Sequence, residues 1–181
     1  MEIGLSQPMP LPDHVLTTSE RSATIKGRPW LRLLRERRCL EGLYVFTDGS
    51  TLGGYAAVVV NPATDEVEQV ARWRPPTLTR NVGAEWDGFV LGLELLPVKA
   101  RATMVVDLLW IHAQLIGVRR AVHAEVAKKL ARAWQLIEEK ELELVLVHHD
   151  GHQADASEFT RWNARADALC AKAARQARAS R

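Results

Sequence analysis

The stretch Leu43-Tyr44-Val45-Phe46-Thr47-Asp48-Gly49-Ser50 decides the fold of this chain. Its first five residues are apolar, aromatic or β-branched and predict a short strand, and Asp48-Gly49-Ser50 is a turn signal. Residues 55–60 predict a second strand that stops at Asn61-Pro62, and the alternating residues 66–73 predict a third. The short links between these segments predict an antiparallel meander.

Helices and further strands follow this meander. Helical spacing of apolar side chains predicts a helix over residues 81–96, in which Gly88 and Gly92 indicate close packing against a sheet. Residues 102–107 and 142–147 predict strands, and residues 108–117, 121–139 and 160–178 predict helices. The order β-β-β-α-β-α-α-β-α defines an α/β chain without a visible internal repeat.

Length and composition predict one globular domain with an appended arm. The chain has 181 residues, 47% of them hydrophobic, and its apolar runs are far shorter than a membrane span. Residues 1–41 are expected to form an arm with a short basic helix over residues 30–40, and residues 42–181 the globular domain. Two cysteines, Cys39 and Cys170, cannot build a disulfide framework, so a cytoplasmic location is expected.

Positive charge gathers near both ends of the chain. Residues 21–40 hold seven basic side chains against one acidic one, and residues 161–181 hold six against one. Such ends around a balanced middle are typical of a protein that binds a polyanion, although two solvated helix faces would show the same pattern. The basic segment 28–38, which includes Trp30, is therefore a candidate contact for nucleic acid.

Four carboxylates stand at positions that structure alone does not require. Asp48 and Asp107 each end a predicted strand, and Glu85 lies on the apolar side of a predicted helix. Asp167 follows Asn163 by four residues, so both lie on one face of the last helix. A single such aspartate is more often a turn or cap residue. Four together would repel one another unless a cation neutralises them, and oxygen ligands favour Mg²⁺ or Mn²⁺.

The blocks that carry these residues resemble the type 1 ribonuclease H family. They are Phe46 to Ser50, Asn81 to Glu85, Met104 to Asp107, Gly151-His152 and Asn163 to Leu169. The resemblance spans residues 43 to about 176 and implies a ribonuclease H-like α/β fold, with a mixed five-stranded sheet flanked by helices.

The same resemblance implies an activity and a site. The activity is cleavage of the RNA strand of RNA–DNA hybrids, leaving 5′-phosphate and 3′-hydroxyl ends. Asp48, Glu85, Asp107 and Asp167 would hold two Mg²⁺ ions, with Mn²⁺ as the alternative, beside His152 on a loop. The implied substrate contacts are Gly49, Ser50, Asn81 and Asn163. The two ions would lie about 4 Å apart, one activating the attacking water and the other stabilising the leaving oxygen.

Several positions depart from the family pattern. Val82, Gly83, Leu108 and Leu109 replace polar groups, most of which contact nucleic acid in the family, whereas the carboxylates are all present. The loop between His152 and Asp167 is expected to be longer than usual. His148 and His149, directly after the last predicted strand, are rivals to His152, although packing or an edge role is expected for them.

Two other interpretations stay open. One is a nuclease of the same fold with another substrate, resembling a resolvase or transposase, and the other is a non-catalytic nucleic-acid-binding module. The expected partner is an RNA–DNA hybrid, with other nucleic acids reached through the basic N-terminal segment. We expect a monomer without a membrane partner.

Overall fold

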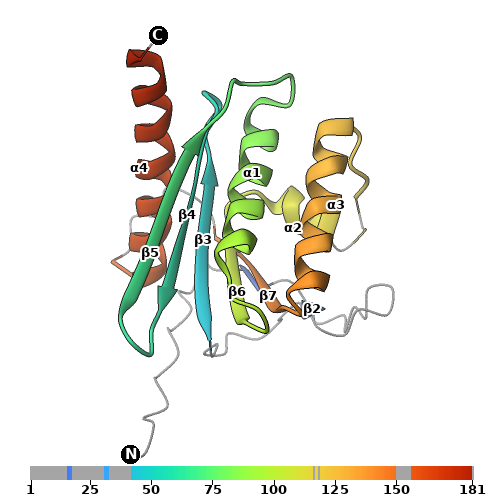
Figure 1. The fold of residues 1–181 in the computed structure, drawn as a ribbon, viewed down its shortest axis with the longest axis vertical. Helices are drawn as coiled ribbons and strands as arrows, with labels where there is room; N and C mark the ends of the chain where they lie inside the picture. The colour runs from blue at the N-terminus through green and yellow to red at the C-terminus, as the bar shows by residue number, and fades with distance from the viewer. Residues whose placement is uncertain are drawn as a thin grey trace, which may run out of the picture.

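The central element of the molecule is a mixed sheet. The computed structural model describes residues 16–17, 31–32, 42–115, 117, 119–149 and 156–180. Five strands lie in the order β7-β6-β3-β4-β5 (Figure 1). They are β3 (Leu43–Gly49), β4 (Gly54–Asn61), β5 (Glu66–Trp73), β6 (Arg101–Val106) and β7 (Glu143–His148). Strands β3, β4 and β5 pair antiparallel, while β6 and β7 continue parallel to β3. The predicted mixed five-stranded sheet is confirmed.

Two short N-terminal strands extend the sheet beyond β7. Strand β1 (Leu16–Thr17) pairs antiparallel with β7, and β2 (Leu31–Arg32) pairs parallel with it. The basic helix predicted over residues 30–40 is therefore wrong at Leu31 and Arg32, because an open sheet edge offers backbone hydrogen bonds that local helical spacing does not reveal. The other residues of that predicted helix, and most of the predicted arm, lie outside the described residues.

Helices cover both faces of the sheet. They are α1 (Arg80–Leu95), α2 (Leu109–Leu115), α3 (Ala124–Glu139) and α4 (Glu158–Ala179). Helix α1 packs on β3 and β4 and against α3, whereas α4 crosses the opposite face over β3, β4 and β5 (Figure 1). The residues of β3 alternate between these layers: Val45 joins the core under α1 and α3, while Tyr44 and Phe46 join the core under α4.

The last helix begins earlier than predicted. The Ser157 side chain accepts a hydrogen bond from the Thr160 backbone N–H at 3.2 Å and caps α4, which starts at Glu158 rather than at residue 160. Phe159 is fully buried and meets Tyr44 and Phe46 edge to face, with ring centroids 5.7 and 5.5 Å away. The expected long loop before Asn163 is thus partly helix, because the burial of Phe159 stabilises the additional helical residues.

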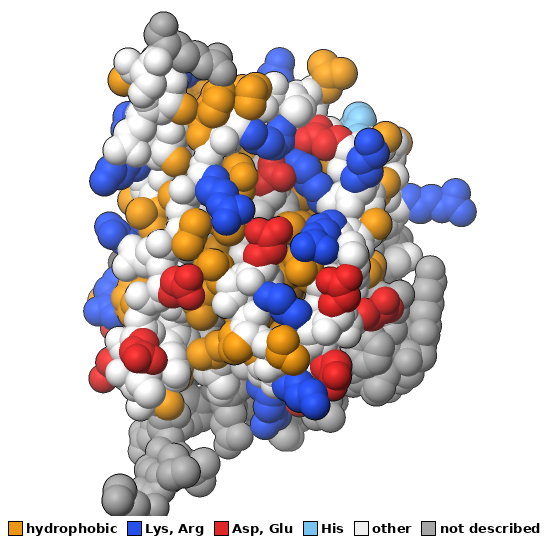
Figure 2. Space-filling model, in the orientation of Figure 1, with side chains coloured by type: hydrophobic (Ala, Val, Ile, Leu, Met, Phe, Trp, Pro, Cys, Tyr) orange, Lys and Arg blue, Asp and Glu red, His pale blue; other side chains and the backbone are white. Residues whose placement is uncertain are grey.

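The other helix ends lie within three residues of the predicted bounds. Val122, which falls within the helix predicted over residues 121–139, lies before α3 and is 84% exposed. Figure 2 shows acidic and basic side chains interspersed over the face formed by α1 and α3. Every helix in the described part of the chain is too short or too polar to cross a bilayer.

Candidate active site

Strand register brings two of the predicted carboxylates together. The ladder between β3 and β6 pairs Phe46 with Val105, so Asp48 and Asp107, each two residues further, come to the same level. Strand β7 runs parallel to β6, and the His149 backbone N–H donates to the Val106 carbonyl at 2.9 Å. His149 therefore lies beside Asp107, at the carboxyl ends of three neighbouring strands.

Glu85 enters the site because α1 lies unusually close to β3. A Cβ atom on Gly49 would lie 2.2 Å from the backbone of Ala84 and Glu85, and one on Gly88 would lie 2.7 Å from the Asp48 carbonyl oxygen. Gly92 likewise meets the Val45 side chain, so the close packing predicted from the helix glycines is confirmed. This approach places the Glu85 carboxylate, only 2% exposed, against the end of β3.

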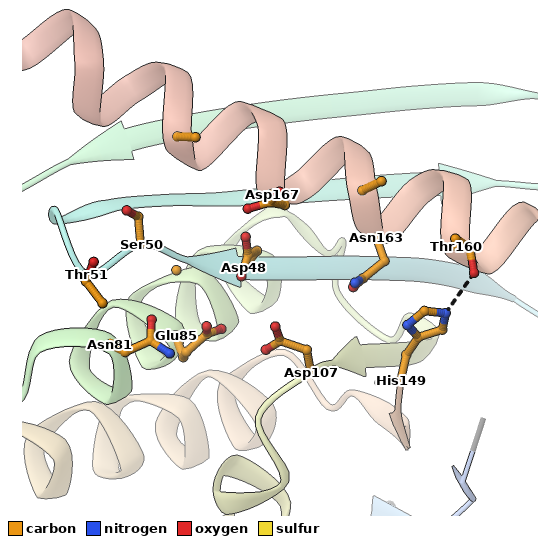
Figure 3. A pocket seen from close by; sticks show the side chains of 13 residues that line it. Asp48, Ser50, Thr51, Asn81, Glu85, Asp107, His149, Thr160, Asn163 and Asp167 are labelled. Atoms are coloured by element: carbon orange, nitrogen blue, oxygen red, sulfur yellow. Dashed lines mark hydrogen bonds between the residues drawn. The ribbon is translucent and has the colours of Figure 1, made fainter. Parts of the chain in front are cut away.

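Helix α4 supplies the remaining residues from the other face of the sheet. Asn163 and Asp167 lie one turn apart and point toward Asp48 (Figure 3). Cys170, one turn further, donates a hydrogen bond from Sγ to Asp48 Oδ2 at 3.1 Å and approaches the Asp167 carbonyl oxygen at the same distance. Burial raises the pKa of the Cys170 thiol well above its usual value, and the charge of Asp48 adds to this rise.

These side chains line one cleft of about 400 Å³ (Figure 3). It contains all the predicted site residues that the structure describes. They are Asp48, Gly49, Ser50, Asn81, Glu85, Asp107, Asn163 and Asp167. Thr51, His149, Thr160, Ala164 and Ala171 complete the lining. His152 and Gly151 lie outside the described residues, so the expected position of the loop histidine stays a prediction.

Crowding changes how readily the carboxylates ionise. Burial raises the pKa of Glu85 well above 4.5, and the charges of Asp107 and Asp48 raise it further. Burial also raises the pKa of Asp107 to about 6, with the charge of Asp48 acting in the same direction. For Asp48, burial raises the pKa, and the hydrogen bond from Cys170 partly opposes this. The cluster is therefore under electrostatic stress when ionised without a cation.

The donor set fits a hard divalent cation. Oxygen atoms of Asp48, Glu85 and Asp107 lie within 4.8 Å of one another, and Asp48 also belongs to a second group with Asp167 and Cys170. Glu85 Oε2 is buried and without a hydrogen-bond partner, which is costly for a carboxylate unless a cation compensates it. Carboxylate oxygens in this arrangement are the ligands that Mg²⁺ prefers.

Charge relief gives a test that needs no substrate. Because the folded-state pKa of Asp107, about 6, lies above its value of 3.8 in the unfolded chain, Asp107 lowers the stability of the fold progressively between about pH 3.8 and about pH 6 and by a constant amount at higher pH. In EDTA, Asp107→Asn should raise the thermal midpoint by about 5 °C at about pH 8, and this gain should shrink toward about pH 5. In excess Mg²⁺ at the higher pH, wild type should instead have the higher thermal midpoint, because Asp107→Asn would lack one of the carboxylates that could hold the ion.

Differential scanning calorimetry of both proteins across this pH range makes the measurement. Burial lowers the pKa of His112 to about 3, so His112 destabilises the fold as pH falls below its usual value of 6.5. That contribution is common to both proteins and cancels in their difference. A stabilisation by Asp107→Asn that is larger at low pH would contradict the repulsion described above.

An ion-pair network fixes the start of α1 against α3. Lys129 Nζ lies 2.8 Å from both Asp87 Oδ1 and Glu125 Oε1 and donates to the Gly83 carbonyl at 2.9 Å. Arg74 bridges the same two acids from the loop after β5. Burial alone would raise the pKa of Glu125, but hydrogen bonds from Lys129 and from two threonines lower it to about 2. The network holds the turns of α1 that carry Asn81 and Glu85.

His149, a rival to His152 for which packing or an edge role is expected, lines the cleft. Its ring is fully buried, stacks on Phe159 at a centroid distance of 6.5 Å, and has Nε2 3.2 Å from Thr160 Oγ1. Parallel register with Asp107 is the signal that could have located it. His148 instead directs Nε2 toward the Asp107 backbone oxygen at 2.7 Å, which fits the expected packing role.

Comparison with known proteins identifies the fold. No protein-family model and no curated protein sequence matches the chain. Solved structures do match. The N-terminal ribonuclease H domain of Rv2228c from Mycobacterium tuberculosis, solved as a fusion with maltose-binding protein, is 22% identical with a TM-score of 0.60. That match covers 76% of this chain and 96% of that one.

Two ribonuclease H1 structures give similar values. The enzyme of the archaeon Halobacterium salinarum is 19% identical with a TM-score of 0.59, covering 72% of this chain and 96% of that one. LC11-RNase H1, in complex with an RNA/DNA hybrid, is 22% identical with a TM-score of 0.59, covering 75% and 98%. The chain therefore has a ribonuclease H-like fold, as the sequence resemblance implied. At this level of identity the likeness concerns the fold, and the activity must be argued from the site.

Proposed function

We propose that this protein is a metal-dependent endonuclease that hydrolyses the RNA strand of RNA–DNA hybrids. The observation that carries the proposal is the convergence on one cleft of Asp48 from β3, Glu85 from α1, Asp107 from the end of β6 and Asp167 from α4. Their mutual repulsion and the unpartnered Glu85 oxygen have no structural benefit, whereas both are consistent with cation binding. The hybrid in the LC11-RNase H1 complex supports the choice of substrate.

Each carboxylate has a distinct place in this mechanism. Asp48 belongs to both acidic groups and would contact both ions, Glu85 and Asp107 would complete one ligand set, and Asp167 the other. When bound, two Mg²⁺ ions would supply activation of the attacking water and stabilisation of the departing 3′-oxygen. The chain's own residues hold the ligand oxygens in place, because the close contact between α1 and β3 keeps Glu85 beside Asp48. The carboxylates would balance much of the positive charge of the bound ions.

Polar groups around the carboxylates would position the substrate. Asn163 is 8% exposed, and its Oδ1 has no hydrogen-bond partner. The Ser50 side chain accepts from the Leu52 backbone N–H at 3.2 Å, which orders the β3–β4 turn at the rim of the cleft. Asn81 lines the opposite side (Figure 3). An amide and a hydroxyl facing a cleft suit hydrogen bonding to sugar and phosphate oxygens.

A substrate panel tests the proposal directly. Labelled RNA–DNA hybrid, double-stranded RNA, double-stranded DNA and both single strands are incubated with Mg²⁺, Mn²⁺ or EDTA. We expect the RNA strand of the hybrid to be cut with either metal, leaving 5′-phosphate ends, and no cleavage in EDTA. Cleavage of branched DNA instead would support a resolvase-like nuclease. Hybrid binding without any cleavage would overturn the enzymatic proposal in favour of a binding module.

The roles of His152 and His149 can be tested separately. His152→Ala should lower the single-turnover rate by about 10²-fold, as expected for an acid–base residue, with metal binding nearly intact. His149→Ala should lower the thermal midpoint, because removing the buried ring leaves a cavity against Phe159. Single-turnover rates and melting curves of both variants from about pH 6 to 9 check this. A slow, stable His149→Ala beside a fully active His152→Ala would transfer the catalytic role to His149.

A further inference from the structure

The backbone of Asp107 is held by a side chain from the neighbouring strand. The last ladder pair of β6 and β7 joins Val106 to His148, and Asp107 follows directly beyond it. The Asp107 carbonyl oxygen lies 2.7 Å from His148 Nε2, 41 residues away in the chain. Because a carbonyl oxygen can only accept a hydrogen bond, the imidazole ring donates from Nε2, and this bond fixes its tautomer.

The ring that makes this hydrogen bond is itself fixed by packing. His148 is buried, and His112 of α2 meets it edge to face, with the two ring centroids 6.3 Å apart. Helix α2 begins at Leu109, two residues after Asp107. His148 therefore contacts both the backbone of Asp107 and the helix that follows it, and it holds the turn between β6 and α2 against β7.

The place of the Asp107 backbone decides where its carboxylate can lie. An aspartate side chain is short, with a single methylene group between the backbone and the carboxylate. The ligand oxygens of Asp107, Asp48 and Glu85 all lie within 4.8 Å of one another. When ionised, these groups repel one another, so a shift of the Asp107 backbone would let its carboxylate move away from the other two.

We propose that His148 is a positioning residue for Asp107, and that its hydrogen bond to the Asp107 carbonyl strengthens the binding of a divalent cation by Asp107, Asp48 and Glu85. His148 is not among the residues that line the cleft, so it acts through Asp107. The hydrogen bond holds Asp107 in place before an ion arrives, so less of the binding free energy is lost in bringing the carboxylates together. The effect on cleavage rests on the proposed function, whereas the effect on cation binding does not.

Substitutions at two positions separate the hydrogen bond from the packing of the ring. His148→Phe keeps an aromatic ring against His112 but removes the Nε2–H donor. His148→Gln restores a donor, because the amide nitrogen of glutamine reaches about as far from the backbone as Nε2. His112→Phe is the matched control, since it changes the partner ring and leaves the hydrogen bond to Asp107 in place. His148→Leu is used as well, in case the larger phenyl ring disturbs the fold.

Mn²⁺ alone, without nucleic acid, is the probe of cation binding. The full chain, stripped of metal, is titrated with Mn²⁺, and the electron paramagnetic resonance signal of the free ion gives the dissociation constant. Melting curves identify the variants that are folded. We expect His148→Phe and His148→Leu to bind Mn²⁺ about tenfold more weakly than wild type, the low end for residues that orient metal ligands. His148→Gln should stay within about threefold of wild type, and His112→Phe should match it.

Equal Mn²⁺ affinity of wild type and the folded His148 variants that lack a donor would overturn the proposal. The same loss of affinity in His112→Phe would overturn it too, because the packing of the two rings, rather than the hydrogen bond, would then control the site. Nuclear magnetic resonance of wild type gives a measurement without any substitution. The nitrogen chemical shifts of the His148 ring should show a proton on Nε2, and a ring that carries its proton only on Nδ1 would exclude the hydrogen bond.

Hybrid cleavage at varied Mg²⁺ concentration separates this inference from the proposed function. His148→Phe should need about tenfold more Mg²⁺ for half-maximal cleavage, while its rate at saturating Mg²⁺ stays close to that of wild type. If Mn²⁺ binding weakens as expected but no protein cleaves the hybrid, the proposed function fails and the positioning role stands. If the hybrid is cleaved but His148→Phe binds Mn²⁺ as tightly as wild type, the positioning role is wrong and the nuclease stands.

Discussion

Replacing Asp48 with Asn should abolish most of the Mg²⁺-supported cleavage, with a loss of about 10³-fold or more in single-turnover rate. Asp48 is the residue shared by both acidic groups, so its neutralisation weakens both proposed ion positions at once. The shape of the side chain is kept, and Asn can still accept the hydrogen bond from Cys170. The fold should survive and gain stability without metal, because one of the crowded charges is gone.

Asp65→Asn is the matched control for this change. Asp65 lies on the exposed turn between β4 and β5 with a backbone φ of 56°, a conformation that Asn also adopts readily. The control should cleave hybrid at the wild-type rate and melt at the wild-type temperature. Full activity of Asp48→Asn, or undiminished cleavage in EDTA, would contradict the metal-dependent mechanism.

A second large effect is expected from a single methyl group at Gly49. The added Cβ of Gly49→Ala would overlap the backbone of α1 at Ala84 and Glu85, where no side chain can rotate away. Overpacking of this kind costs up to about 3 kcal/mol in the free energy of unfolding. Helix α1 must move outward, which carries Glu85 away from Asp48 and lowers activity even in the molecules that remain folded.

Gly117→Ala measures the free-energy cost of the backbone conformation alone, without a steric clash of the added Cβ. Gly117 has a φ of +75°, but a Cβ there would meet open space. Its replacement should therefore cost only about 1 kcal/mol through the backbone conformation, with unchanged cleavage. Chemical denaturation of both variants makes the comparison. A Gly49→Ala protein as stable and active as Gly117→Ala would show that α1 does not need this close approach.

Local patterns in the sequence predicted the strands, the antiparallel meander and the helices, whereas the mixed five-stranded sheet was implied by the resemblance to the ribonuclease H family. Short links require β3, β4 and β5 to form an antiparallel meander, and the apolar spacing of α1 marks Trp86, Phe89 and Leu93 as core residues. The convergence of Asp48 and Asp107 also followed from the sequence, since each ends an apolar strand in a chain of this element order.

Features that depend on distant partners were not predictable in the same way. The strand at Leu31–Arg32 exists because β7 has an open edge, and nothing local to these basic residues signals it. The early start of α4 depends on the space for Phe159 between Tyr44 and Phe46. His149 enters the cleft through the register between β6 and β7, which periodicity within either strand does not reveal.

Because the site is divided between the sheet and α4, its metal affinity would depend on how tightly α4 packs on the sheet. Asp48, Glu85 and Asp107 are held by the α1 side of the molecule, whereas Asp167 and Cys170 belong to a helix that packs on the far face. Its backbone passes so close to β4 that a Cβ on Gly54 would lie 2.0 Å from the Cys170 carbonyl oxygen. Any fluctuation that lifts α4 separates the two ligand halves, so cation binding and the local opening of α4 are thermodynamically linked. In the proposed metal-bound protein, the ion would link the two layers, and amide protons of α4 far from the cleft would exchange more slowly with solvent.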